Sequence, residues 1–368
     1  MATDTSLQIE SQVKRENSFN RCAGIVGKFF EIGSLNIYNE NTAELQLLSP
    51  KEPISWKRAL LLAYDNLVPQ GCYIRLVRKQ NGLSMVFYRS KNKGSRRFLG
   101  IVLAGITLLM VYVSGLALSS NYGEGIAWNP LGYLLGLLVP LLAHELGHWI
   151  TLKKYKTPAS IPYFIPAPPI QLGFIGTFGA IINMRWLPPN ARALSMSSIM
   201  GPLAGFIVAL PFAYYGIKAS IVLPAAATGG VIPFVPLIML LIPTQVTPGP
   251  HEVIVLSPMG FAAFIVFVVT FLNLLPVASL DGGHIVRALA GFRLHYLITI
   301  TTVILLVISS TLWPGFTFFA LLVIFIFYMN RHGHPGTALG IEEVDSGTAL
   351  AGILFGLLLI LTVPIPVT

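Results

Sequence analysis

The stretch NPLGYLLGLLVPLLAHELGHWITL, residues 129–152, decides the fold of this chain. It is long enough to cross the hydrocarbon of a bilayer as a helix, which takes about 20 apolar residues. Yet it carries His144, Glu145 and His148 near its end. A charge at membrane depth costs several kcal/mol unless it faces a partner or a cavity. We therefore expect this helix to be both a membrane span and part of a functional site.

The composition of the whole chain agrees with a membrane protein. Of its 368 residues, 54% are hydrophobic and only 11% are charged, whereas soluble domains carry about 25% charged residues. We predict an α-helical polytopic membrane protein with about seven spans. The expected spans are 98–119, 129–152, 194–216, 254–276, 294–313, 315–330 and 347–365.

The region before the first span is different, because it is polar and basic. Residues 1–20 are expected to be a mobile tail, and residues 21–92 a small cytosolic α/β domain. The pattern predicts a β-α-β-β unit, with strands at 43–48, 72–77 and 83–88 and a helix at 54–67; Asn81-Gly82 favours a tight hairpin. About 70 residues bury only a small core, so we expect this domain to lean on the membrane part or on a partner.

Charge placement predicts the topology of the membrane part, residues 98–368. The segment 220–242 is apolar, but Gly229-Gly230 and three prolines interrupt it, and Pro243 follows directly. If it does not cross, 23 of the 24 Lys and Arg residues lie inside, leaving only Lys218 outside. We therefore predict an excursion that returns to the same side and an N-terminal domain in the cytoplasm. The net charge of +9 describes this cytosolic face, and no nucleic-acid partner is expected.

A second irregular segment, residues 157–186, contains five prolines and then an alternating stretch from Gly173 to Ile181. The prolines forbid a helix, and the alternation is typical of a strand or hairpin. Apolar backbone that is not helical cannot face lipid, because its amides would lack partners. We predict an extended or β re-entrant segment that is buried in protein or lines a water-filled cavity. An apolar connecting loop without a function is an equal alternative.

Only Glu145 and Asp281 place a carboxylate inside the apolar stretches. On a helix His144 and His148 are one turn apart, so both imidazoles point the same way and can hold one metal ion. Glu145 lies beside that ion, where it can accept a proton from water. Zinc needs a third protein ligand, and Asp281 is the only other acid at membrane depth. Pro276 and Gly282-Gly283 are expected to interrupt the helix around it.

At these residues the chain resembles the site-2 protease family of intramembrane zinc metalloproteases. The similarity is carried by HELGH (144–148), GFIGTFGAI (173–181), GPLAGF (201–206) and NLLPVASLDGGH (273–284). The N-terminal domain and the proline-rich insertion are similar to a prokaryotic and plastid branch, and this resemblance implies a prokaryotic plasma membrane. One departure is Ala278-Ser279, where many members carry proline or other small residues. The core of the similarity is residues 129–295.

The resemblance implies one Zn²⁺ held by His144, His148 and Asp281, with Glu145 as general base and acid. It also implies that Asn273 helps to stabilise the scissile carbonyl, and that residues 173–181 resemble the strand on which an unwound substrate lies. The expected partner is a single-span transmembrane protein. The alternative is a zinc-binding membrane transporter or a non-catalytic scaffold. An aspartyl intramembrane protease needs two aspartates, and a rhomboid-like serine protease needs a Gly-x-Ser-Gly motif; this chain has neither.

Other conspicuous residues are given simpler interpretations. We expect His284 to satisfy backbone groups where the helix restarts, rather than to bind metal. We expect His332 and His334 to lie in a polar turn. The two cysteines, Cys22 and Cys72, are too few for a disulfide framework, so a reducing compartment is the simplest inference.

Overall fold

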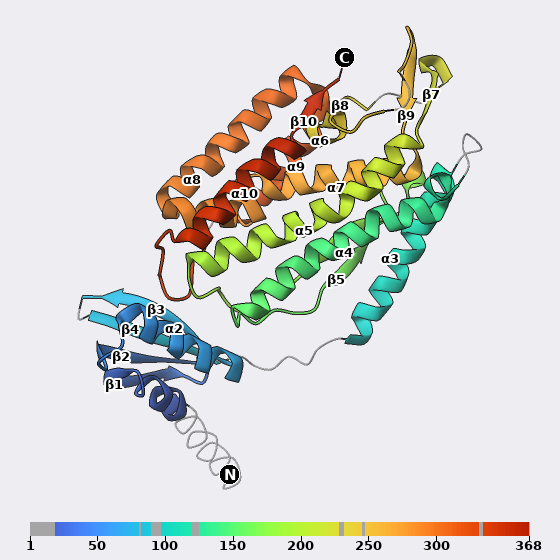
Figure 1. The fold of residues 1–368 in the computed structure, drawn as a ribbon. Coiled ribbons are helices and arrows are strands. Elements are labelled where there is room, and N and C mark those ends of the chain that lie inside the picture. Colours follow the sequence, from blue (N-terminus) through green and yellow to red (C-terminus); the bar gives the residue numbers. More distant parts are fainter. Residues whose placement is uncertain are drawn as a thin grey trace.

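The computed structural model describes residues 19–80, 82–89, 97–119, 125–227, 232–244, 247–330 and 334–367. They form a sheet domain at the N-terminal end and a larger body of helices (Figure 1). The tail expected at 1–20 lies outside the described residues up to position 18, and residues 19–26 are helical.

The N-terminal domain is a four-stranded antiparallel sheet with strand order β1-β2-β4-β3. Its elements are β1 (Phe30–Asn39), β2 (Thr42–Pro50), α2 (Trp56–Leu67), η1 (Val68–Gln70), β3 (Cys72–Lys79) and β4 (Gly82–Arg89). The three predicted strands and the helix are present, and Lys79 pairs with Gly82 across the predicted hairpin; Asn81 itself lies outside the described residues.

The prediction of a single strand before the helix was wrong, because two strands, β1 and β2, precede α2. Only Phe30 of β1 is buried, and the pairing of β1 with β2 shifts register at three places. A strand of this kind lacks the alternation of apolar and polar residues by which a sequence indicates a strand.

Residues of the helical body complete the core of this domain. Ala338 and Leu339 are fully buried in the same apolar cluster as the sheet residues, and Trp186 and Leu187 pack against that cluster. The Trp186 ring stacks on Tyr73 with centroids 5.2 Å apart. The small domain therefore leans on the membrane part, as its size suggested.

Hydrogen bonds to backbone carbonyls fix the direction of this contact. Leu76 N of β3 donates to Ala338 O at 2.8 Å, so the segment after helix α9 (Thr317–Met329) extends the edge of the sheet. Trp186 Nε1 donates to Ile74 O at 2.9 Å, and the Tyr64 hydroxyl donates to Leu187 O at 2.9 Å. Because these groups are buried or half-buried, their hydrogen bonds favour one docked arrangement over a loose tether.

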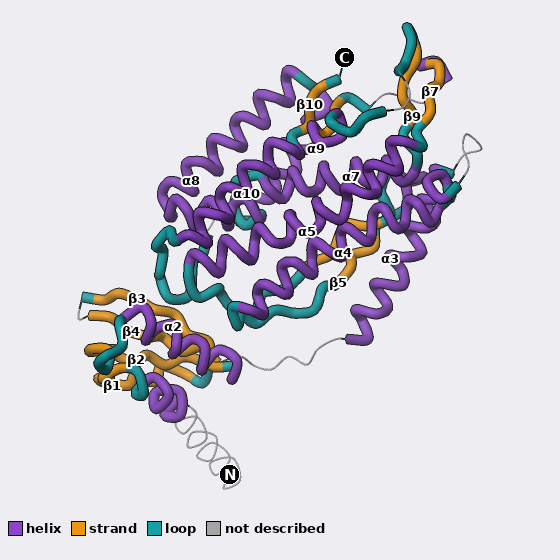
Figure 2. The backbone as a smooth tube through the Cα atoms, in the orientation of Figure 1, coloured by secondary structure: helices purple, strands orange, loops and turns teal. Residues whose placement is uncertain are grey.

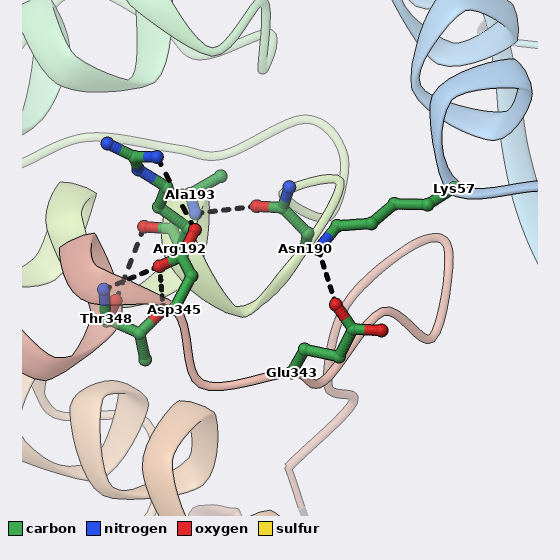
Figure 3. Close-up of polar contacts among 8 residues, drawn as sticks. Lys57, Asn190, Arg192, Ala193, Glu343, Asp345 and Thr348 are labelled. Atoms are coloured by element: carbon green, nitrogen blue, oxygen red, sulfur yellow. Dashed lines mark hydrogen bonds and ion pairs between the residues drawn. The ribbon is translucent and has the colours of Figure 1, made fainter. Parts of the chain in front are cut away.

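Polar contacts continue along the same segment (Figure 3). Lys57 of α2 pairs with Glu343 at 2.5 Å, but both side chains are exposed, so the pair adds little stability. Asp345 accepts from Thr348 N at 2.9 Å and caps helix α10 (Ser346–Thr362), and it also lies 3.5 Å from Arg192. The segment is thus held between the N-terminal domain and the ends of two body helices.

Trp186→Ala is expected to loosen the N-terminal domain, because it removes a stacked ring and a half-buried hydrogen bond, together about 2–3 kcal/mol. Amide exchange in β3 and β4 of the full-length protein should then accelerate by at least about tenfold. The control is Trp313→Ala. Trp313 is 47% exposed and directly follows helix α8 (Asp281–Leu312) in the helical body. Unchanged exchange in Trp186→Ala would show that this contact does not stabilise the domain.

The helical body contains four helices that are long and apolar enough to cross a membrane: α3 (Arg97–Leu118), α4 (Pro130–Lys154), α5 (Ala191–Lys218) and α8 (Asp281–Leu312). Three shorter apolar helices accompany them: α7 (Pro258–Leu274), α9 (Thr317–Met329) and α10 (Ser346–Thr362). The chain is therefore a multi-pass helical membrane protein. Each of the seven predicted spans overlaps an apolar helix, but only four of these helices meet the length of a full crossing.

One boundary differs from the prediction in a way that affects the site. Gly282-Gly283 do not interrupt a helix, because α8 begins at Asp281 and includes both glycines. A Cβ at Gly282 would lie 2.0 Å from Leu274 O, and one at Gly283 2.4 Å from Ala278 O. The two glycines therefore let the first turn of α8 pack against the end of α7 and against the connection that follows it. The departure from helical geometry comes later, at Gly291, with φ of 72°.

The irregular segments form short strand pairs. The remaining elements are η2 (Ile126–Trp128), β5 (Tyr163–Pro166), η3 (Ile170–Leu172), β6 (Thr177–Ile181), β7 (Ile221–Pro224), η4 (Ala225–Ala227), β8 (Phe234–Pro236), α6 (Leu237–Leu240), β9 (Glu252–Val255), η5 (Pro314–Phe316) and β10 (Pro364–Pro366). β5 pairs with β6, β7 with β9, and β8 with β10. Strands β7 and β9 project from one end of the helical body, whereas β5 lies near α3 and α4 (Figure 2). The described residues between 220 and 242 contain no helix longer than α6, which agrees with an excursion that does not cross.

Candidate metal centre

Helix α4 presents two imidazoles and a carboxylate toward the interior of the helical body. His144 is 6% exposed and Glu145 9% exposed. His144 and His148 are four residues apart, and their Nε2 atoms lie 3.0 Å from each other. The helical spacing alone brings these two nitrogens together, as the sequence predicted.

Asp281 reaches the same point from the first turn of α8. Its Oδ2 lies 3.5 Å from His144 Nε2 and 3.3 Å from His148 Nε2. These three residues are the only group of three or more potential metal ligands found in the described part of the chain. Two helices separated by more than a hundred residues of sequence thus converge on one position.

The donor set fits zinc. Ligand atoms that surround Zn²⁺ as a tetrahedron at about 2.0–2.1 Å lie about 3.3 Å from one another, close to the three separations found here. The Ser197 carbonyl can only accept, so the contact of 2.7 Å with His148 Nδ1 requires a proton on that nitrogen. His148 Nε2 then keeps its lone pair for a metal, with Ser197 orienting the ring.

Small residues of α5 make room for both imidazoles. A Cβ at Gly201 would lie 2.1 Å from His148 Nε2, and one at Gly205 would lie 3.0 Å from the His144 Cβ. The close approach of α5 to α4 is mutual, since a Cβ at Gly147 would lie 2.2 Å from Met200 O. Gly201 and Gly205 therefore contribute to the site because they have no side chain, which leaves space for the two imidazoles.

Gly201→Ala is expected to displace His148 and to weaken zinc binding by about 10- to 100-fold, the range seen when residues that orient a metal ligand are changed. Competition with a fluorescent zinc chelator measures this affinity in purified protein. Gly356→Ala is the matched control, because Gly356 also lies in a helix and has open space around its Cβ position. Equal zinc affinity in the two variants would contradict the packing role of Gly201.

The strand pair β5–β6 is attached to the helix that carries the histidines. The Tyr133 hydroxyl of α4 donates to Ile175 O at 3.0 Å, and Ile170 N donates to the Ser114 hydroxyl of α3 at 3.0 Å. The predicted extended segment is therefore a hairpin held between α3 and α4. Among the described strands β6 pairs only with β5, and its Phe178 and Ile181 are 62% and 55% exposed.

The structure corrects the interpretation of His284 and His334. His284 Nδ1 lies 2.5 Å from His334 Nε2, so its partner is a side chain and not the backbone. His334 is 8% exposed and is not part of a polar turn; His332 lies outside the described residues. Burial lowers the pKa of His334 to about 2, which keeps its ring neutral.

The tautomers of this pair follow from one more contact. Gly336 N donates to His334 Nδ1 at 3.0 Å, so the proton of the neutral His334 ring is on Nε2, which donates to His284 Nδ1. The occupied Nδ1 of His284 agrees with the prediction that this residue is not a ligand. Sequence reasoning missed His334, because fifty residues separate it from His284 and no spacing rule links them.

Asn273 lies one residue before the end of α7 and is half-buried. This position is seven residues before Leu280, the residue that precedes α8. Its expected role toward a scissile carbonyl stays a prediction.

Comparison with known proteins gives one family and several plant relatives. Residues 132–312 match the model of Peptidase family M50. The chain is 33% identical over 172 residues to the probable zinc metalloprotease EGY1, chloroplastic, of Oryza sativa subsp. japonica, and 34% identical over 169 residues to the Arabidopsis thaliana protein of the same description. Each of these matches covers 44% of this chain.

A further relative is the probable zinc metalloprotease EGY2, chloroplastic, of Oryza sativa subsp. indica, 28% identical over 235 residues and 61% of this chain. The matches span 28%, 30% and 41% of the lengths of these three relatives. No solved structure matches the chain significantly.

Proposed function

Because this chain belongs to Peptidase family M50 through residues 132–312, we propose that it is an intramembrane zinc metalloprotease. Its reaction is the hydrolysis of a peptide bond in or near a transmembrane helix of a membrane-anchored protein. The observation that carries the proposal is the convergence of His144, His148 and Asp281 from two helices far apart in sequence. A three-ligand site leaves one coordination position for water or substrate, as catalytic zinc sites require.

His144 Nε2, His148 Nε2 and Asp281 Oδ2 would hold the ion. Zinc, when bound there, lowers the pKa of water toward about 7 and polarises a carbonyl as a Lewis acid. The Glu145 carboxylate accepts the proton of the attacking water and then delivers it to the nitrogen of the leaving amine. The Asn273 amide donates a hydrogen bond to the carbonyl oxygen on which charge develops.

The free edge of β6 supports a role in presenting the substrate. A transmembrane helix hides its carbonyls in its own hydrogen bonds, so the segment to be cut must unwind locally. Pairing with β6 replaces part of those bonds, in the manner of strand addition to a sheet edge. The exposed Phe178 and Ile181 then offer apolar contacts to the side chains of a lipid-embedded segment. The substrate class that fits is a single-span membrane protein.

The position of the N-terminal domain supports the proposed orientation. This domain contacts residues 186–187 and 338–339, and α4 reaches the same end of the body with Lys153 and Lys154 in its last turn. Arg192 stands at the start of α5 on that side. Because Lys and Arg tend to stay on the cytoplasmic side, we propose that this end of the body and the N-terminal domain lie in the cytoplasm. The proposed membrane is a prokaryotic plasma membrane, and the seven apolar helical stretches are its proposed spans.

Zinc removal tests the function. The full-length protein, reconstituted with a tagged single-span substrate, is expected to contain one zinc per chain and to cut that substrate. A chelator should stop cleavage, and one equivalent of zinc should restore it. Cleavage that persists without zinc would overturn the proposal.

The alternative is a zinc transporter or a scaffold without activity. In the described part of the chain only one group of three or more potential ligands is found, whereas a transport path needs ligands at several depths. Zinc uptake into proteoliposomes, with no cleavage of any model substrate, would favour the transporter.

A further inference from the structure

The two cysteines of this chain meet in the N-terminal domain, although fifty positions separate them in sequence. Cys22 and Cys72 are the only cysteines among the 368 residues, and both are free thiols. Their side chains share a hydrogen bond. Any disulfide formed within one chain must therefore join these two sulfurs.

Packing places both thiols at the same point. In the helical segment 19–26, Phe19, Ala23 and Val26 are buried, and Cys22 lies on the same helical face, three residues after Phe19. That face packs on the apolar cluster that includes Cys72, the first residue of β3. The helical segment is thus seated on the sheet with its thiol directed at the start of β3.

The surroundings of the pair favour thiol chemistry. Both cysteines line a cavity of about 210 Å³, together with Arg21 and Arg89. The hydrogen bond with Cys72 and the positive charges of Arg89 and Arg21 lower the pKa of Cys22, which is half-buried. The bond to Cys22 and burial raise the pKa of Cys72. Cys22 is therefore the accessible, more acidic thiol, and Cys72 is its buried neighbour.

We propose that Cys22 and Cys72 form a reversible disulfide site that is oxidised by small-molecule disulfides. The Cys22 thiolate attacks one sulfur of the disulfide RSSR, giving a mixed disulfide and one RS⁻. Cys72 loses its proton and attacks the Cys22 sulfur, which releases the second RS⁻ and closes the Cys22–Cys72 bond. Two protein thiols are oxidised, and RSSR is reduced to two thiols.

The bond would tie the helical segment 19–26 to the sheet that docks on the helical body. Residue 76 of β3, four positions after Cys72, makes the hydrogen bond to Ala338. A covalent link that closes this loop restricts the opened states of the domain. In a reducing compartment such a bond forms transiently, as a response to oxidation, rather than as a permanent staple.

Thiol counting in the purified full-length protein tests the site, with oxidised and reduced glutathione as the probe. Under oxidised glutathione the intact mass is expected to fall by two hydrogens with no thiol left to alkylate, and reduced glutathione should restore both thiols. Amide exchange in residues 19–26 should slow by about tenfold or more in the oxidised form. Two free thiols, or glutathione that stays on Cys22 without ring closure, would overturn the proposal.

Three variants separate the steps. Cys72→Ser is expected to accumulate one glutathione on Cys22, and Cys22→Ser to react slowly, because Cys72 is buried. Arg89→Gln should slow the first step at neutral pH by about threefold for each unit by which the pKa of Cys22 rises, since lost thiolate is partly offset by higher nucleophilicity. Disulfide-linked dimers on a non-reducing gel, with no monomeric disulfide, would contradict the intrachain bond.

Discussion

Glu145→Gln is expected to abolish cleavage while zinc stays bound. The amide has nearly the shape of the carboxylate but cannot take a proton from water, so general acid and base catalysis worth about 10²- to 10⁴-fold is lost. The three ligand atoms belong to His144, His148 and Asp281, and none of them changes. Zinc content and turnover should therefore separate in this variant.

The measurement is zinc per chain by elemental analysis, alongside the initial rate of cleavage of a co-reconstituted single-span substrate. Glu252→Gln is the matched control, because Glu252 is exposed on β9. Undiminished cleavage by Glu145→Gln would remove Glu145 from the proposed role. Loss of zinc together with activity would instead show that Glu145 supports the metal site.

Asp281→Ala is expected to release zinc. It removes one of three ligands and leaves His144 and His148 without the carboxylate that lies 3.5 and 3.3 Å from their Nε2 atoms. Changes in residues that merely orient ligands cost about 10- to 100-fold in metal affinity, so the loss of a ligand should cost at least about 100-fold. Cleavage should fall with zinc occupancy.

Zinc retention after dialysis against a buffered zinc solution measures this effect. Asp281→Asn keeps the side-chain volume and distinguishes a lost ligand from a collapsed site, since it too should bind zinc weakly while folding normally. Asp65→Ala changes a surface carboxylate paired with Lys156 and is the control. Full zinc occupancy in Asp281→Ala would remove Asp281 from the ligand set.

The metal ligands could be predicted because their chemistry conflicts with their surroundings. His144 and His148 lie one helical turn apart in an apolar stretch, and Asp281 is the only other acid at comparable depth. In lipid, ionisable residues need partners, so a short list of acids was enough to pair two distant segments. The segments 157–186 and 220–242 could be assigned as irregular from their composition, since proline and glycine exclude a long helix.

Features that depend on local context were harder to predict. Strand β1 was not predicted, because an irregular, exposed edge strand has no periodic pattern in its sequence. The predicted interruption is present around Pro276, between the end of α7 at Leu274 and the start of α8 at Asp281. Gly282-Gly283 were expected to belong to it, because glycine pairs weaken helices in general; instead they let α8 approach Leu274 and Ala278. The contact of His334 with His284 joins two segments that no periodicity connects.

By itself the sequence determined the membrane class, the positions of the apolar helices and the three residues proposed as zinc ligands. These follow from hydropathy and from the cost of burying charge, which act on each residue whatever its neighbours. Only the tertiary structure decided the docking of the N-terminal domain on residues 186 and 338–339, the room that Gly201 leaves for His148, and the meeting of Cys22 with Cys72. Such contacts depend on shape complementarity between segments far apart in the chain, which is settled only when the elements pack.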